Sequence, residues 1–79
     1  MTPIEKARAG LSMLKEAIVE TIREHPDGLR NAEVADLLDL RSDYQGGQQD
    51  YLSWSVIGLL LNEGKVERKE DKRYVIPKA

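Results

Sequence analysis

Apolar residues at helical spacing dominate the N-terminal third of the chain. They recur every three or four residues along one face: Ile4, Ala7, Leu11, Leu14, Ile18 and Ile22. Before this stripe, Thr2 and Glu5 form a Thr-x-x-Glu capping box, with Pro3 at the first helical position, where its missing N–H costs nothing. Because Pro26 disfavours helical geometry in the residue before it, the pattern predicts one long helix over residues 3–25.

A turn, a short helix and a loop are expected next. Pro26-Asp27-Gly28 has the composition of a turn. The second predicted helix spans residues 31–39, and the apolar side chains expected to point inward lie just before it and within it: Leu29, Val34, Leu37 and Leu38. Residues 41–49 are polar and include two adjacent glycines, so we expect an irregular loop there.

The C-terminal third predicts a helix followed by a hairpin. This third helix spans residues 50–63, and Gly64 suits the left-handed conformation of its C-terminal cap. Residues 65–76 are typical of two short strands joined by a turn without an Asn-Gly signal, which leaves their register open. The pattern therefore predicts an α+β, mainly α fold that forms one domain over residues 1–79.

Composition narrows the kinds of site to consider. The 79 residues include no cysteine and one histidine, so we expect no disulfide, no metal and no cofactor. A hydrophobic content of 41% with 33% charged residues fits a folded soluble domain. Apolar runs stay well short of the roughly 18 residues of a membrane span, and the N-terminus lacks a signal-peptide pattern. We expect a cytoplasmic protein that does not bind membranes.

Charge is distributed unevenly along the chain. Residues 1–63 hold 11 acidic and 6 basic side chains, a balance of −5, whereas residues 64–79 hold 3 acidic and 6 basic, a balance of +3. The two parts add to the net charge of −2. An acidic body with a basic C-terminal region is not typical of a non-specific nucleic-acid binder, but it permits a local phosphate contact at that region.

Two segments resemble those of bacterial and archaeal winged helix-turn-helix regulators. Residues 28–35, GLRNAEVA, followed by Leu38 and Leu40, resemble the second-helix signature of that family. Residues 60–68, LLNEGKVER with Leu60 first, resemble the end of its third helix and the first strand of its wing. The likeness covers about residues 11–76. It implies a three-helix winged-helix fold with a C-terminal wing, and a role in binding duplex DNA.

Several side chains are candidates for contacts with DNA under this resemblance. They lie at the start of the second helix, in the loop, on the third helix and in the wing: Arg30, Asn31, Arg41, Gln48, Gln49, Ser53, Trp54, Ser55, Lys65, Arg68, Lys69, Lys72 and Arg73. For the wing, phosphate contact competes with a solvated hairpin whose lysines protect an edge strand. For Arg30 and Asn31, it competes with helix capping by Asn31 or Asp27 and a surface ion pair.

The residues of the third helix suit packing more than the recognition of bases. Counting back from Gly64, its inward side chains are predicted to be Ser53, Val56, Ile57 and Leu60. Its outer side offers no Arg, Lys, Asn or Gln before Asn62, so direct base readout in the major groove is poorly supplied. Trp54 either lies under the first helix, the loop or a second subunit, or it contacts a base or a groove.

Exposed apolar side chains also suggest protein contacts. The first turns of the long helix and the outer side of the third helix supply them: Ile4, Leu11, Trp54, Leu59 and Leu61. Two hypotheses follow. One is a homodimeric DNA-binding regulator, and the other is a protein-interaction module that binds a partner through the third helix.

The sequence does not favour an enzyme. His25 has no nucleophile in an activating context nearby in the sequence. A formal Pro-Asp…Glu-x-Lys match to restriction-type nucleases joins Pro26-Asp27 to Glu63-Gly64-Lys65, but these residues fall in a turn and at a helix end. In those nucleases the acids and the lysine lie on adjacent strands, so the match carries little weight.

Overall fold

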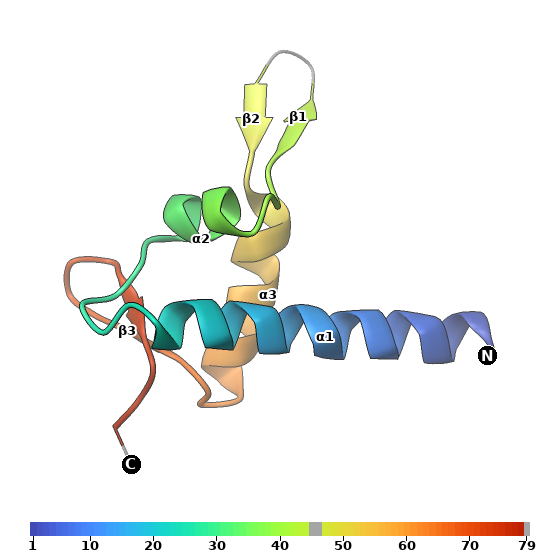
Figure 1. Ribbon diagram of the computed structural model, residues 1–79, viewed down its shortest axis with the longest axis horizontal. Coiled ribbons are helices and arrows are strands. Elements are labelled where there is room, and N and C mark those ends of the chain that lie inside the picture. Colours follow the sequence, from blue (N-terminus) through green and yellow to red (C-terminus); the bar gives the residue numbers. More distant parts are fainter. Residues whose placement is uncertain (45–46, 79) are drawn as a thin grey trace.

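Three helices and two pairs of short antiparallel strands make up the part of the chain that the structure, a computed structural model, describes: residues 1–44 and 47–78 (Figure 1). In chain order they are α1 (Pro3–Arg23), α2 (Asn31–Leu37), β1 (Ser42–Tyr44), β2 (Gly47–Gln49), α3 (Tyr51–Asn62), β3 (Glu67–Arg68) and β4 (Tyr74–Val75). The predicted α+β, mainly α class is confirmed. In these described ranges, no helix is long and apolar enough to cross a membrane.

Both halves of the predicted capping box form at the start of α1. The N–H of Glu5 donates to Oγ1 of Thr2 (3.2 Å), and the N–H of Thr2 donates to Oε1 of Glu5 (3.1 Å). The bond from the Thr2 N–H, with a smaller contribution from the Thr2 side chain, favours the carboxylate and holds the pKa of Glu5 below its ordinary value. The helix ends at Arg23, two residues before the predicted end, because the N–H of His25 bonds to the carbonyl of Ile22 (3.0 Å) in a tighter turn.

The core is formed where α1, α2, α3 and the C-terminal hairpin meet. Each helix contributes one face, and Val66 and Tyr74 close the core from the hairpin side: Ile18, Ile22, Leu29, Val34, Val56, Ile57, Leu60, Val66 and Tyr74 are buried. The inward positions predicted on the third helix are thereby confirmed, with Ser53 also fully buried. Only the second half of α1 takes part, since its first ten residues are all exposed.

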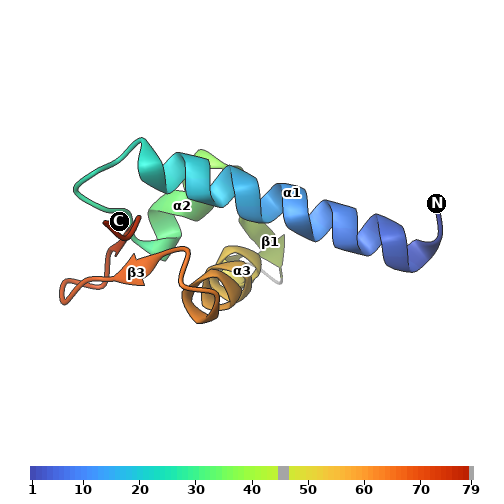
Figure 2. The same cartoon turned by 90° about the horizontal axis from the view of Figure 1, so that it is seen from below.

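The first half of α1 extends past the other elements. Both views show this part of the helix projecting beyond α3 with no other element beside it (Figures 1 and 2). Ile4 is 64% exposed and Leu11 is 37% exposed, although they continue the apolar stripe that Ile18 and Ile22 bury in the core. The stripe is therefore longer than the core that its own chain provides.

The predicted second helix is too long by two residues. It ends at Leu37, and Asp39 adopts the left-handed conformation (φ 55°) while the N–H of Leu40 bonds back to the carbonyl of Ala35 (2.8 Å). This C-terminal turn reverses the chain and leaves Leu37 56% exposed, so its predicted inward position is wrong. Val34 and Leu38 do face the core, as expected.

The stretch predicted to be a loop, residues 41–49, contains a hairpin. Strands β1 and β2 pair antiparallel, with Ser42 opposite Gln49 and Asp43 opposite Gln48. The prediction was wrong because it relied on apolar alternation, whereas this pair is held by backbone hydrogen bonds between polar residues. The two strands project beyond α2 and α3, away from α1 (Figure 1).

The C-terminal hairpin is shorter than residues 65–76 suggest. It pairs Glu67 with Val75 and Arg68 with Tyr74, so the turn between β3 and β4 is five residues long. Its outer edge pairs with Leu29, since Leu29 N–H donates to the carbonyl of Tyr74 (3.1 Å) and Tyr74 N–H donates to the carbonyl of Leu29 (2.7 Å). This bridge fixes the hairpin beside the start of α2.

Candidate nucleic-acid interface

Three segments that are far apart in the sequence meet around Trp54. The start of α2 contributes Arg30, α3 contributes Trp54, and the C-terminal hairpin contributes Arg68 and Lys72. Together they line a shallow pocket of about 510 Å³, whose full lining is Arg30, Asn31, Ala32, Trp54, Arg68, Asp71, Lys72 and Tyr74. We call this surface the Trp54 face. The pairing of Leu29 with Tyr74 brings the hairpin to it.

A buried polar contact sets the position of α3 against α2. The hydroxyl of Ser53 lies 2.7 Å from Oδ1 of Asn31 and 3.0 Å from the carbonyl of Asp50, while Nδ2 of Asn31 donates to that same carbonyl (3.3 Å). Ser53 is fully buried. We therefore remove Ser53 from the candidate DNA contacts, because its hydroxyl is enclosed, and the Asn31 amide serves mainly to join the two helices.

The outer side of α3 is exposed and apolar. Trp54 is 61% exposed and Leu59 is 40% exposed, so α1 covers neither of them. Cover of Trp54 by the first helix was one of the alternatives that the sequence left open. Ser55 is also exposed, as predicted. Tyr51 and Leu52, at 67% and 51% exposed, were missed. Tyr51 lies four residues before Ser55, so the two residues share one side of the helix, and this spacing could have predicted that Tyr51 is exposed.

The hairpin cations divide into two groups. Lys69 and Arg73 turn toward Asp71, at 3.9 and 4.0 Å, and Nζ of Lys69 also donates to the carbonyl of Asp27 (3.3 Å). Within the described residues, Arg68 and Lys72 have no such ion pair and remain exposed. Lys72 holds the left-handed conformation, φ 70°, at the hairpin turn. Lys69 and Arg73 thus compensate the charge of Asp71, and Arg68 and Lys72 remain available for other contacts.

Arg30 occupies the N-cap position of α2 without capping it by its side chain. Oε1 of Glu33 accepts from the N–H of Arg30 (2.9 Å), so capping by Asn31 or Asp27, expected from the sequence, is wrong. The Arg30 side chain stays exposed at the rim of the Trp54 face. It is the third cation there, beside Arg68 and Lys72.

Two further predicted DNA contacts, Arg41 and Lys65, lie on other surfaces. Arg41 pairs with Asp36 (3.1 Å) at the base of the β1–β2 hairpin. The backbone of Gln48 and Gln49 lies on β2, and their side chains are outside what the structure describes. Lys65 lines a separate groove against α1. The sequence alone could not show that Lys65 lies apart from the other hairpin cations, because the orientation of the hairpin depends on long-range packing.

The predicted protein-contact residues are also dispersed. Ile4 and Leu11 lie on the projecting part of α1, whereas Trp54 and Leu59 lie on α3, and all four are exposed. Leu61 is only partly exposed, because it packs against the core. The structure therefore offers two separate apolar surfaces rather than one.

Neither a candidate metal site nor a similar known protein indicates what the Trp54 face binds. Over residues 1–44 and 47–78, no group of three or more His, Asp or Glu side chains is placed to hold a metal ion. Comparison of the chain with protein families, curated proteins and solved structures finds no match. What this surface binds must therefore be argued from its own residues and geometry.

Proposed function

We propose that this chain is a winged helix-turn-helix protein that binds duplex DNA through the Trp54 face, with β3 and β4 as its wing. The observation that carries the proposal is the convergence of Arg30, Arg68 and Lys72 around an exposed Trp54. These cations come from segments that the sequence separates by more than a third of the chain. Their meeting on one face concentrates positive potential on a molecule that is acidic overall.

The chemistry of this face favours contact with the DNA backbone over base reading. Arginine and lysine side chains at its rim supply phosphate contacts, which position a protein on the duplex without reading sequence. The exposed side of α3, from Tyr51 to Leu61, offers no Arg, Lys, Asn or Gln to base edges. We propose that Trp54 and Ser55 contribute shape and van der Waals contacts in a groove, so that the affinity is modest and strongly dependent on salt.

The proposal is tested by the salt dependence of duplex binding. Fluorescence anisotropy of a labelled duplex is measured with the wild-type protein and with Arg68→Ala/Lys72→Ala at several salt concentrations. The wild type is expected to bind at low salt and to weaken as salt rises. The double variant is expected to weaken binding and to lower the slope of log K against log salt by about two, since each lost phosphate contact removes about 0.9.

A charge-matched control separates this face from overall charge. Lys6→Ala/Lys78→Ala removes two exposed cations that do not line the Trp54 face. This control is expected to bind with the wild-type slope. Equal effects of both double variants, or no binding by the wild type at low salt, would contradict the proposal.

A second function, protein binding through α3, rests on its exposed apolar side. Tyr51, Leu52, Trp54 and Leu59 are each at least 40% exposed, and exposed apolar patches of this kind often mark interfaces. This alternative predicts that duplex DNA does not bind at low salt. It also predicts that Leu59→Gln, which removes apolar surface without changing charge, alters the state of assembly, whereas the DNA-binding proposal predicts no such change.

A further inference from the structure

Two aromatic rings lie open to solvent at or beside the Trp54 face. Trp54 is 61% exposed, and Tyr51, three residues earlier on α3, is 67% exposed. Residues three apart on a helix are neighbours on its surface, so both rings lie on one side of α3. Tyr74 also lines the face, but it is 6% exposed and belongs to the core. The accessible aromatic surface here is therefore supplied by α3.

The amide that lines this face is not free to read a base edge. Among the described residues of the lining, Asn31 is the one with an amide side chain. Its Oδ1 accepts from the hydroxyl of Ser53 (2.7 Å), and its Nδ2 donates to the carbonyl of Asp50 (3.3 Å). The amide is thus used inside the molecule, and the exposed side chain between the cations of the face is the indole ring of Trp54.

Three exposed cations, which we call the rim cations, surround that ring: Arg30, Arg68 and Lys72. Asp71 lies on the same face, but Lys69 and Arg73 lie 3.9 and 4.0 Å from its carboxylate and compensate its charge. The face therefore combines an aromatic ring with a net positive rim, which suits the flat side of a base and the phosphates that flank it.

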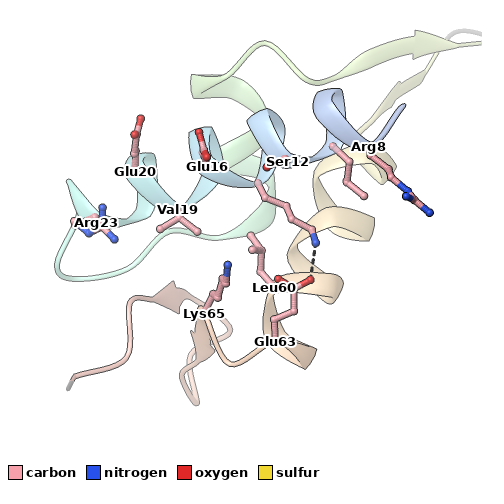
Figure 3. A pocket seen from close by; sticks show the side chains of 11 residues that line it. Arg8, Ser12, Glu16, Val19, Glu20, Arg23, Leu60, Glu63 and Lys65 are labelled. Atoms are coloured by element: carbon pink, nitrogen blue, oxygen red, sulfur yellow. Dashed lines mark hydrogen bonds and ion pairs between the residues drawn. The ribbon is translucent and has the colours of Figure 1, made fainter. Parts of the chain in front are cut away.

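The groove between α1 and the C-terminal end of α3 lacks this combination. An ion pair between Lys15 and Glu63 (2.5 Å) crosses its volume of about 640 Å³ (Figure 3). Glu16 and Glu20 also belong to its lining, and none of the described residues that line it is aromatic. Carboxylates there oppose the approach of phosphates, so this groove is a poor site for a nucleic acid.

Paired and unpaired bases differ in what they offer to an exposed aromatic ring. In a continuous duplex each base is stacked between its neighbours, so the grooves present base edges and phosphates. An unpaired base can leave the stack and expose its flat side, on which aromatic side chains stack. The exposed side of α3 has rings and no amide or cation for base edges, so it matches the unpaired base better.

We propose that the Trp54 face prefers DNA that contains unpaired bases, and that one such base stacks on Trp54 while the rim cations hold the flanking phosphates. Tyr51 lies within reach of a neighbouring base on the same side of α3. This inference rests on the proposed function, because it specifies which DNA the same face prefers. On a fully paired duplex, the rim cations supply most of the affinity.

Two DNAs with the same number of phosphates test the preference. Anisotropy at low salt compares a labelled, fully paired duplex with one of equal length in which a short central run of pairs is mismatched. The wild type is expected to bind the mismatched DNA about tenfold more tightly, since stacking of one base on an aromatic side chain contributes about that factor. Trp54→Ala is expected to lose most of this preference. Trp54→Phe is expected to retain part of it, because phenylalanine also offers a flat ring.

Two further variants separate stacking from apolar surface and from charge. Leu59 is exposed on α3 and does not line the face, so Leu59→Ala is expected to keep the wild-type ratio of the two affinities. Arg68→Ala/Lys72→Ala is expected to weaken binding to both DNAs and to keep their ratio, because both DNAs present the same number of phosphates. Trp54 and Leu59 lie outside the core, so circular dichroism should show the wild-type fold for their variants.

The outcomes distinguish this inference from the proposed function. Equal binding of the two DNAs by the wild type, or a preference that survives in Trp54→Ala, would overturn the inference and leave DNA binding by this face in place. Absence of binding to either DNA at low salt would contradict both.

Discussion

The hydroxyl of Ser53 lies 2.7 Å from Oδ1 of Asn31, and this contact joins α2 to α3 inside the molecule. Both residues had been predicted to contact DNA. Their mutual hydrogen bond instead holds α3 at a fixed position relative to the start of α2. Arg30 precedes Asn31, and Trp54 follows Ser53, so this contact sets the distance between two neighbours that both line the Trp54 face.

Removal of the Ser53 hydroxyl should lower stability. Ser53→Ala deletes a fully buried group that bonds to Asn31 and to the carbonyl of Asp50. A buried acceptor left without its donor costs about 1–3 kcal/mol, so the free energy of unfolding should fall by that amount in urea titration. The matched change Ser55→Ala, at an exposed position, is expected to stay within about 0.5 kcal/mol of the wild type. Equal losses for both variants would contradict this role.

The same substitution at two glycines should have opposite effects. Gly28 holds a φ of 95°, and a Cβ added there would lie 2.9 Å from Cβ of Arg73 and 3.2 Å from the carbonyl oxygen of Tyr74. Gly28→Ala is therefore expected to destabilise the fold by roughly 2 kcal/mol or more. Gly10 lies in the projecting part of α1 with nothing within 4 Å of its added Cβ.

Because a Cβ added at Gly10 meets no other atom, Gly10→Ala is expected to be neutral or to stabilise the fold by up to about 1 kcal/mol, through the higher helix propensity of alanine. Thermal melts followed by circular dichroism compare the two variants with the wild type. A tolerated Gly28→Ala would show that the turn before α2 is not as constrained as the geometry indicates. A destabilised Gly10→Ala would show that a side chain at position 10 is not free of contacts.

Stability should depend on pH through the ion pair between Lys15 and Glu63. The hydrogen bond from Lys15 holds the pKa of Glu63 below its ordinary value near 4.5. Because the folded state lowers this pKa, the contribution to stability is complete above the ordinary value. It is lost as the pH falls from there through the lowered pKa of the folded state.

The melting temperature measured from pH 7 to pH 3 checks this. Glu63→Gln should lower the melting temperature at pH 7 slightly and should flatten part of the decline below the ordinary pKa of Glu63. Glu70→Gln is the matched control at an exposed carboxylate of the hairpin turn. If Glu63→Gln and Glu70→Gln gave the same profile, the ion pair would not contribute to the pH dependence.

A substitution at Lys72 should weaken DNA binding with little effect on the stability of the fold. Its left-handed conformation, φ 70°, suits glycine better than lysine, yet the position carries an exposed cation on the Trp54 face. Lys72→Gly is expected to change the free energy of unfolding by less than about 1 kcal/mol, since relief of backbone strain offsets the added freedom of the unfolded chain. Anisotropy with a labelled duplex is expected to show weaker binding. Unchanged binding would exclude Lys72 from the interface.

The sequence predicted the local features of this fold well. The capping box at Thr2 and Glu5 depends only on neighbouring residues, and the inward face of α3 follows from helical spacing counted back from Gly64. The β1–β2 hairpin was missed because Ser42 and Asp43 pair with glutamines and carry no alternating apolar signal.

Long-range contacts account for most of what the sequence could not predict about the candidate interface. Asn31 and Ser53 lie 22 residues apart, and each alone has the chemistry of a phosphate contact. In the same way, Lys69 and Lys72 have the same side chain, but Nζ of Lys69 donates to the carbonyl of Asp27, 42 residues earlier, whereas Lys72 has no such bond within the described residues. Residue type identified the candidates, and tertiary packing decided which of them remain accessible.

The most direct test of DNA binding by the Trp54 face uses the intrinsic fluorescence of the protein. Trp54 is the only tryptophan of the chain and lines the proposed interface. Its emission is recorded at low salt while an unlabelled duplex is added, and the anisotropy of a labelled duplex is followed in parallel. We predict that Trp54 emission is quenched with the same midpoint as the anisotropy, and that added salt reverses both. DNA binding that leaves Trp54 emission unchanged, or no binding at low salt, would contradict the proposed interface.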